Sequence, residues 1–85
     1  MTIHSSHPDI IARLKRAHGH LAAVLTMFEQ GRSCLDLAQQ LHAVESAVGN
    51  AKRELIHDHI EHCLVEGGEP NRDTLKELKQ LTKYL

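Results

Sequence analysis

Residues 34–63 read CLDLAQQLHAVESAVGNAKRELIHDHIEHC, and this stretch decides the fold. It has no proline, and its only glycine is Gly49. Ser33 precedes it as a helix N-cap, with Asp36 three residues further on, and Gly67 follows it as the next helix breaker. Apolar residues recur along it at the alternating spacings of three and four that are typical of a coiled-coil seam: Leu41, Val44, Val48, Ala51 and Leu55. The stretch therefore predicts one long helix, from about Cys34 to Glu66, with an interface stripe along it.

The length of this helix predicts an oligomer. At about 1.5 Å per residue it would be roughly 50 Å long, which exceeds the diameter expected for a globule of 85 residues. We expect its stripe to pack on the first helix along one part and on a neighbouring subunit's long helix along the rest. The simplest arrangement is an antiparallel pair with twofold symmetry.

Two shorter helices flank the long one. The first is predicted from Pro8 to Gln30, with Ser6 and Asp9 forming a capping box and Gly31 as a left-handed C-terminal residue. A turn at residues 69–71 precedes the third helix, which is marked by four leucines at helical spacing: Leu75, Leu78, Leu81 and Leu85. The predicted fold is all-α, with residues 1–85 forming one three-helix domain and residues 1–7 an N-terminal arm.

Composition narrows the class of protein. The net charge is −1 with histidines neutral, so any contact with nucleic acid must come from a local basic patch. The sequence has no apolar run of about 20 residues that could cross a bilayer and no secretory signal. We therefore expect a cytoplasmic protein with two free thiols. Eight histidines in so short a chain are an excess that needs a reason.

Three residues on the long helix form a candidate metal site. His59 and Cys63 lie one turn apart on the same face. Cys34 shares that face but lies about 37 Å away along the axis, so it cannot bind the same ion within one subunit. In an antiparallel pair, Cys34 of one subunit would lie beside His59 and Cys63 of the other. Two thiolates and one imidazole suit Cu(I), or Zn(II) and Ni(II) with a fourth ligand.

Two further groups of residues extend this hypothesis. His4 and His7 lie on the N-terminal arm and are candidate additional metal ligands. Five basic residues are candidate contacts to DNA: Arg13, Lys15, Arg16, Lys52 and Arg53. Taken alone, a basic cluster is usually a solvated helix face, and a helical cysteine is usually a small apolar side chain.

The sequence resembles the CsoR/RcnR family of bacterial metal-sensing repressors. The resemblance rests on RLKRAHGHL at 13–21, CLDLAQQLHAV at 34–44 and DHIEHC at 58–63. It implies a three-helix subunit, an antiparallel dimer, a dimer of dimers, and a repressor that leaves operator DNA when metal binds. It also implies that Cys34, His59 and Cys63 are the ligands of a copper(I) sensor and that the basic residues contact DNA.

Departures from the copper-sensor pattern leave the metal open. Such sensors carry a Tyr before the first Cys, where this chain has Ser33, and a Glu in the third helix, to which Glu77 or Lys79 corresponds depending on alignment. Nickel and cobalt sensors of the family use an N-terminal His, so His4 or His7 keeps Ni(II) and Co(II) as alternatives. Persulfide sensors of the family lack the His, so His59 favours metal.

The sequence therefore predicts a Cu(I)-responsive transcriptional repressor that binds double-stranded operator DNA as a homo-oligomer. The alternatives are a Ni(II)- or Co(II)-sensing repressor and a cytosolic metal-binding module without a regulatory role. An enzyme is not expected, because Cys34 or Cys63 paired with His59 lacks a third orienting residue.

Overall fold

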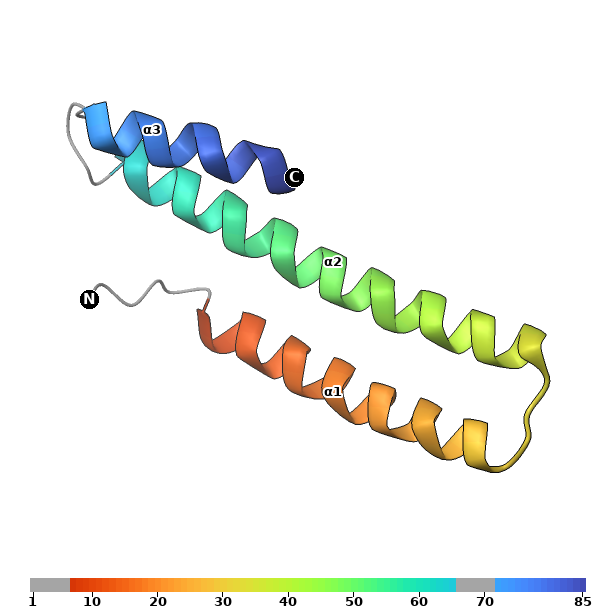
Figure 1. Cartoon of the computed structure of the whole chain (residues 1–85). Coiled ribbons are helices and arrows are strands. Elements are labelled where there is room, and N and C mark those ends of the chain that lie inside the picture. The colour runs from red at the N-terminus through yellow and green to blue at the C-terminus, as the bar shows by residue number, and fades with distance from the viewer. Residues whose placement is uncertain (1–6, 66–71) are drawn as a thin grey trace.

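The computed structural model describes residues 7–65 and 72–85. These residues form α1 (His7–Glu29), α2 (Cys34–Val65), α3 (Arg72–Leu81) and a final 3-10 turn, η1 (Thr82–Tyr84). The all-α fold of three helices with a long central one is confirmed (Figure 1). No helix in this part of the chain combines the length and the apolar content that crossing a membrane requires.

A tight turn folds α1 and α2 into an antiparallel hairpin (Figure 1). The backbone N–H of Arg32 donates to the carbonyl of Met27 at 3.2 Å, and the N–H of Gly31 donates to that of Phe28 at 3.1 Å. This is the Schellman pattern of helix termination, and Gly31 takes the left-handed conformation that it requires, with φ of 70°. The predicted role of Gly31 is confirmed.

The start of α2 is capped as predicted. The hydroxyl oxygen of Ser33 accepts a hydrogen bond of 3.1 Å from the backbone N–H of Asp36. The helix then runs without a break through Gly49 to Val65, and its predicted last residue, Glu66, lies outside the described residues. The α1 helix begins at His7, so His7 belongs to the helix and not to the predicted arm. Ser6 and the turn at 69–71 lie outside the described residues.

The core of the hairpin is built from small and medium-sized apolar residues spaced seven apart. The buried side chains are Ile10, Ala17 and Val24 on α1 and Leu37, Val44 and Ala51 on α2. A spacing of seven keeps a residue on the same side of a helix that winds around its partner. The two rows therefore form the seam between α1 and α2.

A second pair of rows lies four residues further along each helix and forms what we call the apolar face. It consists of Leu14, Leu21 and Phe28 on α1 and Leu41, Val48 and Leu55 on α2, each between 41 and 53% exposed. The predicted stripe of α2 is thus divided by side, with Val44 and Ala51 buried in the hairpin and Leu41, Val48 and Leu55 left at the surface. The sequence had suggested a division along the length of the helix.

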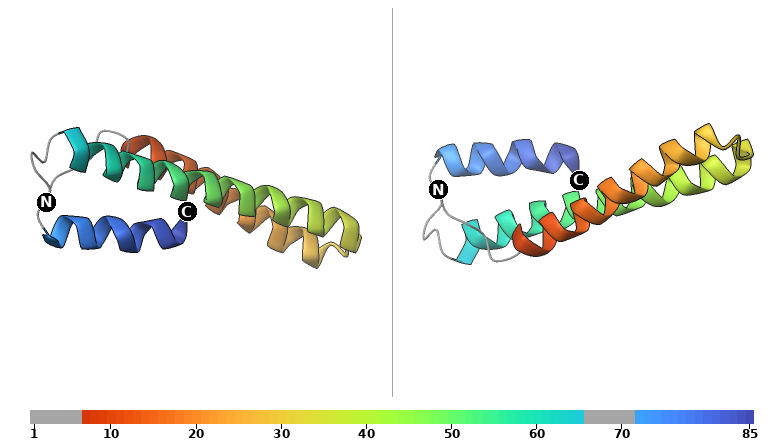
Figure 2. Two further views of the ribbon diagram at one scale, coloured as in Figure 1. Left: turned by 90° about the horizontal axis from the view of Figure 1, so that it is seen from above. Right: turned by 90° about the horizontal axis from the view of Figure 1, so that it is seen from below.

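The α3 helix runs back along the C-terminal half of α2, on a different side from α1 (Figure 2). Ile56, in this half of α2, is only 2% exposed. The described residues form an elongated body of 56 × 23 × 15 Å. Its length is close to that of α2, so the two ends of α2 lie at opposite ends of the molecule.

Candidate metal site and nucleic-acid interface

The α2 helix holds Cys34 and His59 far apart. Cys34 is the first residue of α2 and is an exposed free thiol at the turn end of the hairpin. His59 lies near the other end, about 37 Å further along the axis at ~1.5 Å per residue. Within the described part of a single chain, no group of three or more His, Cys, Asp or Glu side chains is arranged to hold a metal ion.

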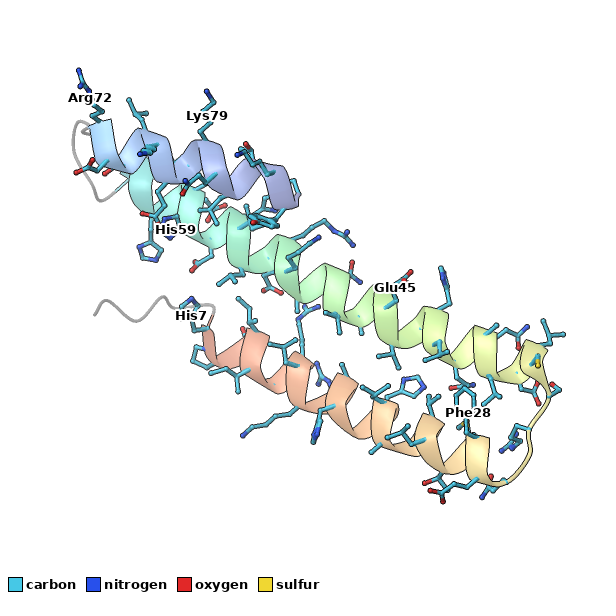
Figure 3. All side chains as sticks on the ribbon, viewed as in Figure 1. His7, Phe28, Glu45, His59, Arg72 and Lys79 are labelled. Atoms are coloured by element: carbon cyan, nitrogen blue, oxygen red, sulfur yellow. The ribbon has the colours of Figure 1, made fainter. Side chains whose placement is uncertain are left out.

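The imidazole of His59 lies where α2 meets α3 (Figure 3). Its Nε2 atom is 3.2 Å from Oε1 of Glu77 on α3. Lys79, the other residue that the alignment allowed here, projects from α3 away from α2 (Figure 3). The structure therefore assigns Glu77, and not Lys79, as the α3 partner of His59.

The remaining candidate ligands lie near this same end of the molecule or beyond the described residues. Cys63 is one turn after His59 on α2, and its side chain lies outside the described part of the structure. His7 is the first residue of α1 and lies at the same end of the hairpin as His59 (Figure 3). His4 lies outside the described residues.

The five basic residues do not share one surface. At about 100° per residue, Arg16 lies about 60° around α1 from Arg13, whereas Lys15 lies about 160° away. On α2, Glu54 contacts Arg13. By the same spacing, Lys52 points about 160° away from Glu54, on the side of α2 turned away from Arg13. Arg53 bonds to Asn50 one turn earlier through its guanidinium. Of the three basic residues on α1, Arg13 and Arg16 therefore lie closest together around the helix and form one basic patch.

Sequence reasoning missed two polar contacts that join α1 to α2. Nε of Arg13 is 3.2 Å from Oε2 of Glu54, and Nε2 of His20 is 2.7 Å from Oε1 of Gln40. We call these four residues the polar edge of the hairpin. Arg13 and His20 are seven apart and Gln40 and Glu54 fourteen apart, so each pair shares one position of the seven-residue repeat. That periodicity is the signal that would have pointed to them.

Comparison with known proteins connects this arrangement to a family. The family model described as "Metal-sensitive transcriptional repressor" matches residues 6–84, which is nearly the whole chain. No solved structure is similar enough to this chain to count as a match.

Several relatives carry names that describe copper sensing. The chain is 43% identical over 51 residues to the copper-sensing transcriptional repressor CsoR of Mycobacterium ulcerans, covering 60% of this chain and 44% of the relative. It is 36% identical over 58 residues to CsoR of Bacillus subtilis, covering 68% of this chain and 57% of the relative. It is 33% identical over 60 residues to the copper-sensing repressor RicR of Mycobacterium tuberculosis, covering 66% of this chain and 62% of the relative. These matches thus span about half the length of the relatives.

The resemblance predicted from residues 13–21, 34–44 and 58–63 is confirmed by these matches. They describe regulators, in agreement with the prediction that the chain is not an enzyme. The family match extends beyond the three quoted motifs to all three helices. The chain belongs to the family of metal-sensitive transcriptional repressors.

Proposed function

We propose that this protein is a repressor that binds operator DNA in its metal-free form and releases it on binding Cu(I). The proposed ligands are His59 and Cys63 together with Cys34 of the partner subunit. Relatives whose names describe copper sensing favour copper as the metal. The two thiolates and one imidazole are soft donors that suit a monovalent copper ion.

The observation that carries this proposal is the unbroken path of α2 from Cys34 to His59. Because α2 is rigid and about 37 Å separates these residues along it, they can meet only when two subunits pair in opposite directions. Cys34 also lies seven residues before Leu41, in the same row as Val48 and Leu55 on the apolar face. An antiparallel partner that covers this face would therefore also cover Cys34.

The surroundings of His59 fit a metal ligand. Imidazoles that bind metals commonly donate their second ring N–H to a carboxylate, which fixes the tautomer and the direction of the ring. Oε1 of Glu77 lies 3.2 Å from Nε2, within ion-pair distance but outside hydrogen-bond geometry, and a small rotation of either side chain would let it accept that proton. The tautomer with its proton on Nε2 presents Nδ1 as the lone-pair donor.

Regulation follows from ligands that come from two subunits. Coordination by Cys34 of one subunit and His59 of another would tie two helix ends together and favour one arrangement of the subunits. Arg13 and Arg16 lie on the outside of the hairpin, so a change in subunit arrangement alters their spacing relative to DNA phosphates. The coupling is reciprocal: DNA should weaken Cu(I) binding by the same factor by which Cu(I) weakens DNA binding.

The test is an anaerobic Cu(I) titration of the protein bound to a fluorescent DNA duplex from upstream of its own gene. Wild-type protein should release the duplex, and Cys34→Ala should bind it with similar affinity but remain bound when Cu(I) is added. His42→Ala, which removes an exposed histidine from the same helix, is the matched control and should release DNA normally. Release by Cys34→Ala would refute the proposed site, and failure of the wild-type protein to bind the duplex would refute the function.

A second candidate is a repressor that responds to Ni(II) or Co(II). It is favoured by His7, which lies at the same end of the molecule as His59 (Figure 3) and would add a nitrogen ligand for a metal of higher coordination number. The same titration with Ni(II) and Co(II) separates the two. Release by these ions that is lost in His7→Ala, with no response to Cu(I), would favour the second candidate.

A further inference from the structure

The strongest feature outside the proposed metal site is the ion pair between Arg13 and Glu54. Nε of Arg13 is 3.2 Å from Oε2 of Glu54, and the two side chains are 48% and 34% exposed. The pair joins two helices, so it depends on the hairpin and not on local sequence. It also involves one of the basic residues that the family resemblance assigns to DNA contact.

We propose that Glu54 limits the affinity of this protein for its operator by competing with DNA phosphate for Arg13. The inference rests on the proposed function, because it requires Arg13 to contact the DNA backbone. Glu54 would then help to set the affinity of the protein for operator DNA. It does not touch the DNA itself, and it acts through Arg13.

The position of the pair supports competition. A guanidinium makes its strongest contacts with carboxylate and phosphate groups, and both use the same N–H donors. While Nε of Arg13 is engaged by Glu54, a phosphate must either displace the carboxylate or approach a guanidinium whose charge is already partly neutralised. Removing the carboxylate removes both costs and also removes a negative charge beside the phosphate.

Arg16, on the same surface, provides the comparison with an arginine that has no carboxylate partner among the described residues. It lies about 60° around α1 from Arg13, is exposed, and forms no ion pair with any residue that the structure describes. Arg13 and Arg16 thus belong to one basic patch, but only Arg13 is partly neutralised. Glu54 therefore weakens the attraction of this patch for phosphate at one of its two arginines.

Losing the pair should not unfold the hairpin. Partly exposed ion pairs contribute little to stability, whereas the seam residues on both helices are buried. The hydrogen bond of 2.7 Å between His20 and Gln40 also remains to hold the polar edge together. Glu54→Gln keeps the size and polarity of the side chain and removes only its charge.

The test compares the affinity of wild-type and Glu54→Gln full-length protein for the same operator duplex, metal-free, across a range of salt concentrations. We expect Glu54→Gln to bind roughly two- to five-fold more tightly for each Arg13 in contact with DNA, the range that corresponds to a surface ion pair. The dependence of affinity on salt should also become steeper, because each freed arginine displaces more counterion.

Two further variants exclude a general effect of charge. Glu45→Gln removes a carboxylate from an exposed position on the same helix (Figure 3) and should change affinity much less. In an Arg13→Ala background, Glu54→Gln should have almost no effect, since the residue through which it acts is gone.

The outcomes are distinct. Unchanged or weaker binding by Glu54→Gln, an equal gain from Glu45→Gln, or a gain that persists without Arg13 would each overturn the inference while leaving the proposed function intact. Failure of the wild-type protein to bind the duplex would instead remove the proposed function itself. A thermal unfolding curve for Glu54→Gln close to that of wild type confirms that the comparison is between folded proteins.

Discussion

The contact between His59 and Glu77 ties the proposed metal site to the third helix. A carboxylate lies 3.2 Å from Nε2, where a modest rotation would let it accept the ring proton and fix the ring, and a ligand ordered before the metal arrives binds more tightly than one that must be ordered. At the scale of single residues, α3 therefore contributes to metal affinity without supplying a ligand.

This role of Glu77 gives the first prediction. Glu77→Gln should lower the affinity for Cu(I) by roughly 10- to 100-fold, the usual effect of losing the carboxylate behind a metal-binding imidazole. The measurement is an anaerobic competition with a chromophoric Cu(I) chelator. Lys79→Gln is the matched control, because Lys79 lies two residues away and projects from α3 away from α2 (Figure 3). Equal affinities for Glu77→Gln and wild type, or an equal loss in Lys79→Gln, would contradict this assignment.

At the scale of elements, the α1–α2 hairpin depends on how α1 ends. Gly31 has φ of 70° and closes the helix with two backbone hydrogen bonds. Side chains with a Cβ rarely adopt this conformation, at a cost of about 1–2 kcal/mol. The direction in which α2 leaves the turn, and with it the antiparallel pairing, is set at this residue.

The second prediction contrasts two glycines of the same hairpin. Gly31→Ala should lower the free energy of unfolding by about 1–2 kcal/mol, even though no atom lies within 4 Å of the added Cβ. Gly19→Ala, within α1 and also free of neighbours within 4 Å, should instead stabilise by up to about 1 kcal/mol because alanine favours helix. Chemical denaturation measures both. Similar changes for the two variants would show that backbone conformation at Gly31 is not limiting.

Local chemistry explains which elements the sequence could predict. Gly31 and Ser33 mark helix ends through backbone angle and hydrogen bond, so the end of α1 and the start of α2 followed closely from the sequence. The separation of Cys34 from His59 followed from helix length alone. Both depend only on residues close in sequence or on a fixed rise per residue.

Contacts between elements were harder to predict. The pairing of Arg13 with Glu54 depends on the register of α1 against α2, and a shift of one turn would give Arg13 another neighbour. Likewise, the sequence identified Leu41 and Val44 as one stripe but could not assign Val44 to the hairpin seam and Leu41 to its surface. Only the packed hairpin distinguishes these roles.

At the scale of the whole molecule, the apolar face argues for a partner. Six large apolar side chains, each at least 41% exposed, lie in two rows along one side of the hairpin: Leu14, Leu21, Phe28, Leu41, Val48 and Leu55. A continuous apolar patch of this kind on a small protein usually marks an interaction surface. A second hairpin placed antiparallel against it would complete a four-helix bundle, and Cys34, in the α2 row, would approach the far end of the other subunit's α2.

This geometry leads to the third prediction, which concerns mixed oligomers. Alone, Cys34→Ala and Cys63→Ala should each lack intact Cu(I) sites, since each variant breaks both sites of an antiparallel dimer. In a mixed dimer, one site loses both cysteines, but the other combines the intact Cys34 of the Cys63→Ala subunit with the intact Cys63 of the Cys34→Ala subunit. Co-expression with two different affinity tags allows the mixed species to be isolated.

The mixed dimer should then bind one Cu(I) with an affinity near that of wild type, measured by chelator competition. A pool of the two single variants purified separately and combined without subunit exchange is the control and should show no such binding. If each site were instead built within one subunit, every site in the mixed dimer would lack a cysteine and the tight binding would not return. Restored binding therefore distinguishes a site shared between two subunits from one confined to a single chain, because it requires the two ends of α2 to meet across the subunit interface.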